Sequence, residues 1–353
     1  MPSTTLISLL RTPQAVGQLT GEAWNAVVLA GRQYQLLGAL AALLQRSGHW
    51  VGVPQAVQRH LELELLTATR RSEAALWEVS VIRRTVAMAV DLVLLKGCAY
   101  IAAGDVNHQG RSFSDVDLMI PHSVLQRVEM ELIGGGWKPS RVDAYDDGYY
   151  RNWMHEIPPM EHVRRRTVLD LHHAINPPVA AYYVNPELLR SSVVAISPGL
   201  YVLSPLDRVA HCAIHLIQEG ETKKLLRDLY DLHLLLGQHC SGDDGLAALF
   251  ARSQMLGVRH LVGAAVAAAN QLFGQKTREL PSTWLQRCLV VGAQNAHERG
   301  SVRGNIAGLF LLTYSHWIRM PLKLLVPHLC RKSIKALFSR ETDQHAVNIA
   351  SNA

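Results

Sequence analysis

One stretch, residues 90–120, constrains the fold of this chain more than any other. An apolar run ends at Lys96-Gly97, and a short helical segment and a polar loop follow. A second apolar run then begins with Asp115 and Asp117. Side chains alternate between the two faces of a strand, so the two aspartates would project side by side. Two carboxylates at such a short distance repel each other. A divalent cation such as Mg²⁺, bound to both carboxylates and to substrate phosphates, removes the repulsion. The stretch predicts strand, glycine turn, helix and strand, with a cation site.

A third acid is expected on a later strand. Residues 164–173 alternate in polarity, which places Val168, Asp170 and His172 on one face. The Lys96-Gly97 turn would add backbone N–H groups and an ammonium, both suited to phosphate. Carboxylates on one rigid face, beside a phosphate-binding turn, are what two-metal phosphoryl transfer requires.

The bulk properties narrow the class of protein. The 353 residues are 48% hydrophobic, enough for a sizeable core and two or three domains. Five scattered cysteines without CxxC spacing favour a reducing compartment over a disulfide framework or structural zinc. We expect neither a signal peptide nor a membrane span, which needs about 18 apolar residues. A net charge of +6 fits anionic partners but does not by itself indicate nucleic acid.

Helices are predicted on both sides of this core. Residues 1–89 form an N-terminal helical region. It includes a helix over about 55–89, whose outer face is expected to carry solvated arginines, with binding of an anionic substrate as the alternative. These arginines are Arg70, Arg71, Arg83 and Arg84. The core spans 90–176, with a helix at 124–133 and short strands or loops at 137–160. A C-terminal helical domain spans 177–300, with helices at 205–218 and 222–238 and two or three more before 298.

The remaining residues, 301–353, are predicted to form a basic amphipathic helical tail. No Asp or Glu lies between Arg319 and Arg340. We expect the tail to cap the helical domain with a solvated face; the alternative is peripheral contact with the inner face of a membrane.

Three motifs together resemble the nucleotidyltransferase superfamily, and more closely its uncharacterised bacterial branch. They are Leu95-Lys96-Gly97, the segment from Arg111 through Ser114-Asp115-Val116-Asp117-Leu118, and Asp170-Leu171-His172. The motif-bearing part covers about residues 88–175. The resemblance implies an α+β fold in which a small mixed sheet is flanked by helices and the three acids cluster at its edge.

The resemblance also implies roles for individual residues. Asp115 and Asp117 would hold two Mg²⁺ ions, with Mn²⁺ as an alternative, and through them a nucleoside triphosphate such as ATP. Asp170 would hold the catalytic metal and help to deprotonate the acceptor hydroxyl. Gly97 matches the glycine of a phosphate-binding Gly-Ser turn. Cys98 stands where the family has serine, and because a thiol is a weak donor, we expect Lys96 to supply part of the phosphate contact.

Further candidates come from the pattern of single residues. Arg111 shares strand parity with the aspartate pair and would either pair with these acids or reach a phosphate. His172 shares a face with Asp170, and it would touch substrate or metal or be structural. His155 would line the acceptor site. His211 and His215 have helical i, i+4 spacing, but no acid between them matches a HExxH zinc motif, so packing or substrate contact is favoured.

The sequence therefore predicts a cytoplasmic, Mg²⁺-dependent nucleotidyltransferase. It would move a nucleoside monophosphate from a triphosphate to an acceptor hydroxyl and release pyrophosphate. The acceptor is expected to be a small molecule or a protein rather than a nucleic acid. Two alternatives stay open: a non-catalytic nucleotide-binding or regulatory protein with the same fold, and a phosphotransferase that moves only the terminal phosphate.

Overall fold

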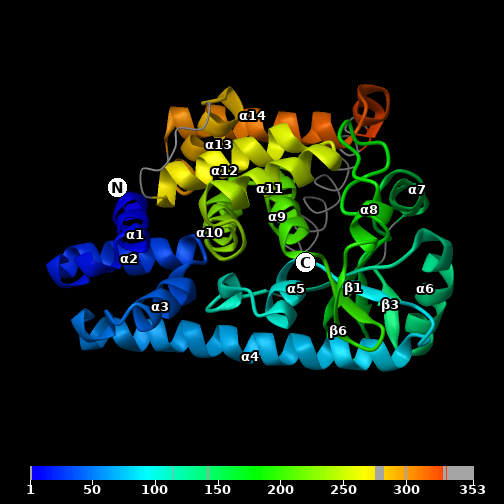
Figure 1. Cartoon of the computed structure of the whole chain (residues 1–353), viewed down its shortest axis with the longest axis horizontal. Helices are drawn as coiled ribbons and strands as arrows, with labels where there is room; N and C mark the ends of the chain where they lie inside the picture. The colour runs from blue at the N-terminus through cyan, green and yellow to red at the C-terminus, as the bar shows by residue number, and fades with distance from the viewer. Residues whose placement is uncertain are drawn as a thin grey trace, which may run out of the picture.

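A mixed β-sheet with helices on both sides forms the protein. The computed structural model describes residues 2–113, 115–140, 143–274, 282–298, 300–328 and 331. The long helix α4 (Gln55–Thr85) runs along one side of the sheet, and the C-terminal helices lie on the other (Figure 1). The predicted α+β class, a mixed sheet between helical regions, is confirmed.

The described helices fall into three groups. Those before the sheet are α1 (Pro2–Arg11), α2 (Gly21–Gln33), α3 (Leu37–Arg46) and α4, with 3-10 turns at Pro13–Gln18 and Trp50–Gly52. Those among the strands are α5 (Lys96–Ala103), α6 (Leu125–Gly134), α7 (Ala144–Trp153) and α8 (Pro186–Arg190), with 3-10 turns at Val106–His108 and His122–Val124. Those after the sheet are α9 (Pro205–Glu219), α10 (Thr222–His239), α11 (Gly242–Met255), α12 (Arg259–Phe273), α13 (Trp284–Asn295) and α14 (Val302–Arg319).

Seven strands form one sheet in the order β3-β4-β5-β2-β1-β7-β6. They are β1 (Leu92–Leu94), β2 (Asp115–Met119), β3 (Trp137–Pro139), β4 (Met160–His162), β5 (Val168–His172), β6 (Val194–Ser197) and β7 (Leu200–Val202). The pairs β2–β5 and β1–β7 are parallel, and the other neighbouring pairs are antiparallel. The three strands predicted near residues 90–95, 115–120 and 164–173 are therefore confirmed, and β2 lies at the centre of the sheet.

Strand alternation divides the core between the two faces of the sheet. Leu92 and Leu94 of β1 pack in a cluster that includes Ile82 of α4. Val93 and Leu95 face the other way and belong to the large cluster formed with the C-terminal helices. Both faces of the central strands are thus buried, which is typical of strands that read as continuous apolar runs.

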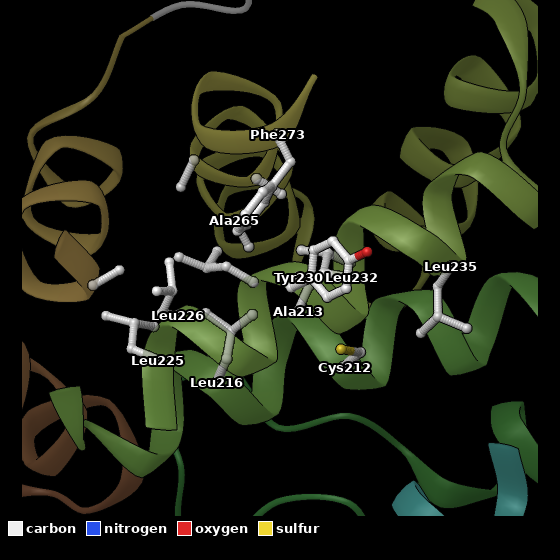
Figure 2. Packing of buried hydrophobic residues seen from close by; sticks show 14 of the residues in the cluster. Cys212, Ala213, Leu216, Leu225, Leu226, Tyr230, Leu232, Leu235, Ala265 and Phe273 are labelled. Atoms are coloured by element: carbon white, nitrogen blue, oxygen red, sulfur yellow. The ribbon is translucent and has the colours of Figure 1, made fainter. Parts of the chain in front are cut away.

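Helix α9 begins where the sequence predicts it. The hydroxyl of Ser204 accepts a hydrogen bond from the backbone N–H of Asp207, and Pro205 occupies the first helical position. Its apolar side chains pack against α10 and α12 (Figure 2). The predicted helices near 124–133, 205–218 and 222–238, and those before 298, are confirmed by α6, α9, α10 and α11 to α13.

One prediction for residues 137–160 is wrong. The short strands β3 and β4 are there, but α7 lies between them. The carboxylate of Asp143 caps α7 by accepting from the backbone N–H of Asp146 at 2.8 Å. Aromatic residues and Gly148 lower the helix propensity of this segment, while an Asp cap followed by Asp146 and Asp147 is a start signal for a helix.

A second correction concerns the segment after Pro178, which was predicted to be helical. Strands β6 and β7 form a hairpin there, joined at Pro198-Gly199, and β7 extends the sheet beside β1. Gly199 has φ +69°, a conformation that suits glycine, and a Pro-Gly pair is a turn signal. The four-part division of the chain stays a prediction, and the sheet continues into the range assigned to the C-terminal helical domain.

Arg83 is a third correction. It is buried, not on the outer face of α4. Its guanidinium donates to the carbonyl oxygens of Val90 and Gly199, at 2.6 and 2.9 Å, and to two carbonyls at the end of its own helix. The two terminal guanidinium nitrogens donate all four of these hydrogen bonds, while Nε has no partner among the described residues. The side chain ties α4 to the β6–β7 turn, and these bonds offset much of the cost of its burial.

No single helix among the described residues is long and apolar enough to cross a membrane. Helices α2 and α3 reach the length and apolar composition of a membrane span only when they are taken together, and the chain bends by 119° between them. In the predicted basic tail, α14 and the helical residues 322–328 are described. Residues 329, 330 and 332–353 of that tail lie outside the described residues.

Candidate functional site

The register of two parallel strands brings the second and third acids together. In the pairing of β2 with β5, Asp117 lies opposite Asp170, and Asp115 lies opposite Val168. Donor atoms of Asp117, Asp170 and His172 all lie within 4.8 Å of one another. Parallel strands paired in this register point the side chains of opposite residues to the same face of the sheet. The predicted alternation along each strand therefore places Asp117 and Asp170 on one common face.

Lys96 approaches the same cluster from the first position of α5. Its Nζ lies 2.7 Å from Oδ1 of Asp117. The backbone of Lys96 has φ +45°, which is unusual for a residue other than glycine. Such conformations cluster at functional sites. Burial would raise the pKa of Asp117, but the Lys96 ammonium and the hydrogen bond from His172 hold that pKa well below its usual range. Asp117 is therefore ionised.

Asp170 has the opposite electrostatic situation. Burial, together with the charges of Asp117 and Glu156, raises the pKa of Asp170 to about 7. Its Oδ1 is buried and has no hydrogen-bond partner among the described residues. A buried carboxylate oxygen in that position has room in its coordination for a cation, and carboxylate oxygens are ligands that Mg²⁺ prefers. Asp117 and Asp170 thus fit the magnesium site that the sequence predicts.

A cavity of about 580 Å³ opens in front of this cluster. The residues predicted from the sequence to form the site all line it, with one exception, Cys98. They are Asp115, Asp117, Asp170, Lys96, Gly97, Arg111, His155, His172, His211 and His215. The cavity therefore brings together side chains that are up to 119 positions apart along the chain (96 to 215).

Cys98 lies in the first turn of α5 and packs in the buried cluster with residues of β1 and β2. It is buried, and its Sγ is 4.0 Å from the carbonyl oxygen of Asp115. Burial, with the charges of Asp117 and Asp115, raises the pKa of this thiol to about 12, so it remains protonated. Contact between Cys98 and a nucleotide, as predicted, would require this side chain to line the cavity. In the described structure it does not line the cavity.

Gly97 allows two cavity residues to approach the turn. A Cβ at Gly97 would lie 2.9 Å from the ring of Phe113 and 3.3 Å from a guanidinium nitrogen of Arg111. Arg111 itself donates from Nε to Oδ2 of Asp231 at 2.6 Å and lies near the ring of Tyr100. Arg111 was predicted either to pair with Asp115 and Asp117 or to reach a phosphate. It pairs with neither of these aspartates. Its acidic partner comes from α10, and strand β2 begins only at Asp115.

The two predicted histidines of α9 line the cavity. The ring centroids of His211 and His215 are 6.1 Å apart. Burial lowers the pKa of His211 to about 3, so its imidazole is neutral. Neither belongs to a group of metal-ligating side chains among the described residues. They remain candidates for substrate contact, as the sequence predicts.

The helices also supply basic cavity residues that the sequence did not place in the site. Basic side chains line it from four helices; they are Arg32, Arg71, Lys224, Arg227 and Arg319. Arg71 donates to the hydroxyl of Ser112 at 2.6 Å, which joins α4 to the loop before β2. For Arg71, anion binding was the lesser of two sequence interpretations, and its position favours it. No local sequence pattern predicts that the other four basic residues line the cavity, because only the packing of helices that are distant in the sequence brings them there.

Comparisons with known proteins agree with this geometry. A sequence model of the family described as "uncharacterised nucleotidyltransferase" matches residues 20–274, which is more than half of the chain. The match covers α2 to α12 and therefore the entire sheet and most of the cavity lining. No curated protein and no solved structure matches the chain.

Proposed function

The chain belongs to the uncharacterised nucleotidyltransferase family, and from this premise we propose that it transfers a nucleoside monophosphate from a nucleoside triphosphate to an acceptor hydroxyl. Pyrophosphate is the other product. The observation that carries the proposal is the register pairing of Asp117 with Asp170 at the wall of a large cavity. Transfer chemistry of this kind needs carboxylates fixed on one rigid face, and two paired central strands provide that rigidity.

The cofactor we propose is Mg²⁺, with Mn²⁺ as the alternative. Asp117 and Asp170 would hold it, and Asp115, one pleat along β2, would complete the carboxylate set. When bound, the metal offsets the charge of the triphosphate and polarises the phosphorus that is attacked.

The chain's own residues would bind the phosphates and move the proton. Lys96 and the basic side chains Arg71 and Arg227 line the cavity and offer charge-assisted hydrogen bonds to phosphate oxygens. Asp170, next to the metal, would also help to deprotonate the acceptor hydroxyl. His211 and His215, which also line the cavity, would contact the acceptor, which we propose is a small molecule or a protein.

A titration with Mg²⁺ and each nucleoside triphosphate tests the first step. We expect the wild-type protein to bind a triphosphate and Asp117→Asn to lose most of that affinity. Asp91→Asn is a matched control, because Asp91 is an exposed carboxylate next to β1 that does not line the cavity. Absence of binding in the wild type would remove the basis of the proposal, and equal binding in Asp117→Asn would place the nucleotide elsewhere.

A second experiment identifies the reaction. The protein is incubated with labelled triphosphates and cell extract, and the labelled acceptor and the released phosphate species are analysed. Release of pyrophosphate supports nucleotidyl transfer, whereas release of a nucleoside diphosphate indicates transfer of the terminal phosphate only.

Nucleotide binding without transfer is the second candidate function. The position of Cys98 favours it, because the turn after Lys96-Gly97 presents no side-chain hydroxyl to the cavity. Binding of a triphosphate without pyrophosphate release in any extract would support this candidate over the transferase.

We further propose a cytoplasmic location with contact at the membrane surface. The described cysteines Cys98, Cys212, Cys240 and Cys288 are free thiols, which suits a reducing compartment. Ile306, Leu309 and Trp317 of α14 are 64%, 67% and 49% exposed, on a segment without acidic residues from 299 to 340. An exposed apolar face flanked by basic residues suits an anionic lipid surface. Sedimentation with anionic vesicles, compared between wild type and Leu309→Glu, tests this contact.

A further inference from the structure

A second group of donor atoms lies beside the aspartate cluster and shares one residue with it. His155 and Glu156 follow α7, and His172 ends β5. Glu156 and His172 form an antiparallel backbone bridge, and the backbone N–H of His173 donates to the carbonyl of His155 at 2.8 Å. These contacts fix the backbone on both sides of the group. Donor atoms of the three side chains lie within 4.8 Å of one another.

The hydrogen bonds of His172 determine which ring nitrogen carries the proton. Its Nε2 lies 3.1 Å from Oδ1 of Asp117, the same oxygen that accepts from the Lys96 ammonium. A carboxylate paired with an ammonium is ionised and only accepts hydrogen bonds, so Nε2 of His172 must donate. A neutral imidazole then has its lone pair at Nδ1.

A second acceptor lies close to that nitrogen. Nδ1 of His172 is 3.3 Å from Oε2 of Glu156, and the His172 side chain is 1% exposed. Nδ1 has no hydrogen-bond partner among the described residues, and the same holds for Nδ1 of His155. Two acceptors at this distance repel unless a proton or a cation lies between them. A proton would satisfy only this one contact, whereas a cation can also take the His155 ring as a ligand.

The distances fit a tetrahedral ion. With metal–ligand bonds of about 2.0–2.1 Å, two ligands of a tetrahedral ion are about 3.3–3.4 Å apart. The His172–Glu156 distance of 3.3 Å matches that edge, and Nε2 of His155 lies 4.0 Å from Oε2 of Glu156, within reach of a side-chain rotation.

We propose that His155, Glu156 and His172 form a second cation site, for a divalent ion of the zinc class, on the cavity wall next to the aspartates. Two imidazole nitrogens and one carboxylate are a donor set typical of zinc sites that keep an open fourth position, whereas Mg²⁺ favours oxygen ligands. Asp117 orients the His172 ring from the far side, as carboxylates do behind metal-bound histidines. The inference concerns ion binding and does not rest on the transfer reaction.

Binding of Zn²⁺ to the full chain, freed of metal with a chelator, is the test. Calorimetry measures affinity and stoichiometry, and the visible absorption of Co²⁺ reports four-coordinate geometry. We expect about one equivalent of Zn²⁺ in the wild type. Glu156→Gln and His155→Ala should each weaken it by at least about 100-fold, because loss of a direct ligand costs more than loss of an outer partner, which costs about 10–100-fold.

Two controls separate this site from other binding. His211→Asn removes a buried cavity histidine outside the group and should leave Zn²⁺ binding unchanged. Asp170→Asn should leave Zn²⁺ bound, because Asp170 belongs only to the other cluster. Equal Zn²⁺ affinity in wild type, Glu156→Gln and His155→Ala would overturn the proposal. Loss of Zn²⁺ in Asp170→Asn with retention in Glu156→Gln would also overturn it. Circular dichroism of the metal-free variants establishes that each is folded.

Discussion

Gly38 of α3 and Gly110, in the loop before β2, meet backbone to backbone. A Cβ at Gly38 would lie 2.3 Å from the carbonyl oxygen of Gly110, and a Cβ at Gly110 would lie 2.1 Å from that of Gly38. Both residues line the cavity. The N-terminal helices therefore dock directly on the loop that carries Arg111, and a side chain at either glycine would separate them.

Gly110→Ala is expected to destabilise the protein more than a comparable substitution elsewhere. Gly110 and Gly48 have similar positive φ values, +73° and +76°, but a Cβ at Gly48 meets nothing within 4 Å. Gly48→Ala should cost about 1–2 kcal/mol for the left-handed backbone alone. Gly110→Ala should cost about 1–3 kcal/mol more, because the backbones must move apart. Urea denaturation of both variants measures the difference, and equal losses would contradict the contact.

Asp105 is predicted to link the stability of the fold to acid pH. It is fully buried, and its carboxylate accepts from Arg208 at 2.7 Å and from His239 at 2.8 Å. Burial alone would raise its pKa, but these partners lower it. Because the folded-state pKa is below the unfolded value of about 3.9, this carboxylate stabilises the protein at neutral pH and loses that effect as pH falls below about 4.

Asp105→Asn should therefore lose about 3–5 kcal/mol of unfolding free energy at pH 7, since it leaves a buried guanidinium without its ionised partner. The difference from wild type should shrink below about pH 4. Urea denaturation across this pH range measures it. A difference that stays constant down to pH 3 would show that the ionisation of Asp105 does not contribute.

The strand-borne part of the site could be predicted from the sequence because it depends on local periodicity. Alternation is enough to put Asp115 and Asp117 on one face of β2, and Asp170 and His172 on one face of β5. Their meeting needs the register of the β2–β5 pair, which the family resemblance implied and no local pattern fixes.

Other features depend on contacts between distant segments, and local patterns mislead there. Arg83 resembles a surface arginine, but it is buried, and its two terminal nitrogens donate to four carbonyl oxygens near the end of α4 and the β6–β7 turn. Arg111 shares parity with the aspartates, yet its partner Asp231 is 120 positions away. Glu156, adjacent to His155 in the predicted acceptor segment, reaches His172 only through a bridge between two segments of the folded core.

Arg71→Ala is expected to weaken binding of a magnesium–triphosphate complex. Arg71 lines the cavity, whereas Arg70, its neighbour on α4, pairs with Glu73 and does not. One charge-assisted hydrogen bond contributes about 1.5–3 kcal/mol, so the dissociation constant should rise roughly 10- to 100-fold in Arg71→Ala. Arg70→Ala should bind as the wild type does. Calorimetric titration of both variants measures this, and equal affinities would place the phosphates away from α4.

Lys96→Met is expected to have opposite effects on metal and nucleotide. The Lys96 ammonium and a divalent ion compete for Oδ1 of Asp117, which the ammonium approaches to 2.7 Å. Without Lys96 the buried carboxylate lacks a counter-charge, so Mg²⁺ alone should bind at least about tenfold more tightly, or about 1.4 kcal/mol. The triphosphate complex should bind more weakly, because a phosphate partner is lost. Lys224→Met is the matched control: it removes a cavity ammonium that pairs with Glu221 and does not contact Asp117, and it should leave the Mg²⁺ affinity unchanged. Unchanged Mg²⁺ affinity in Lys96→Met would show that the ammonium and the ion do not share that oxygen.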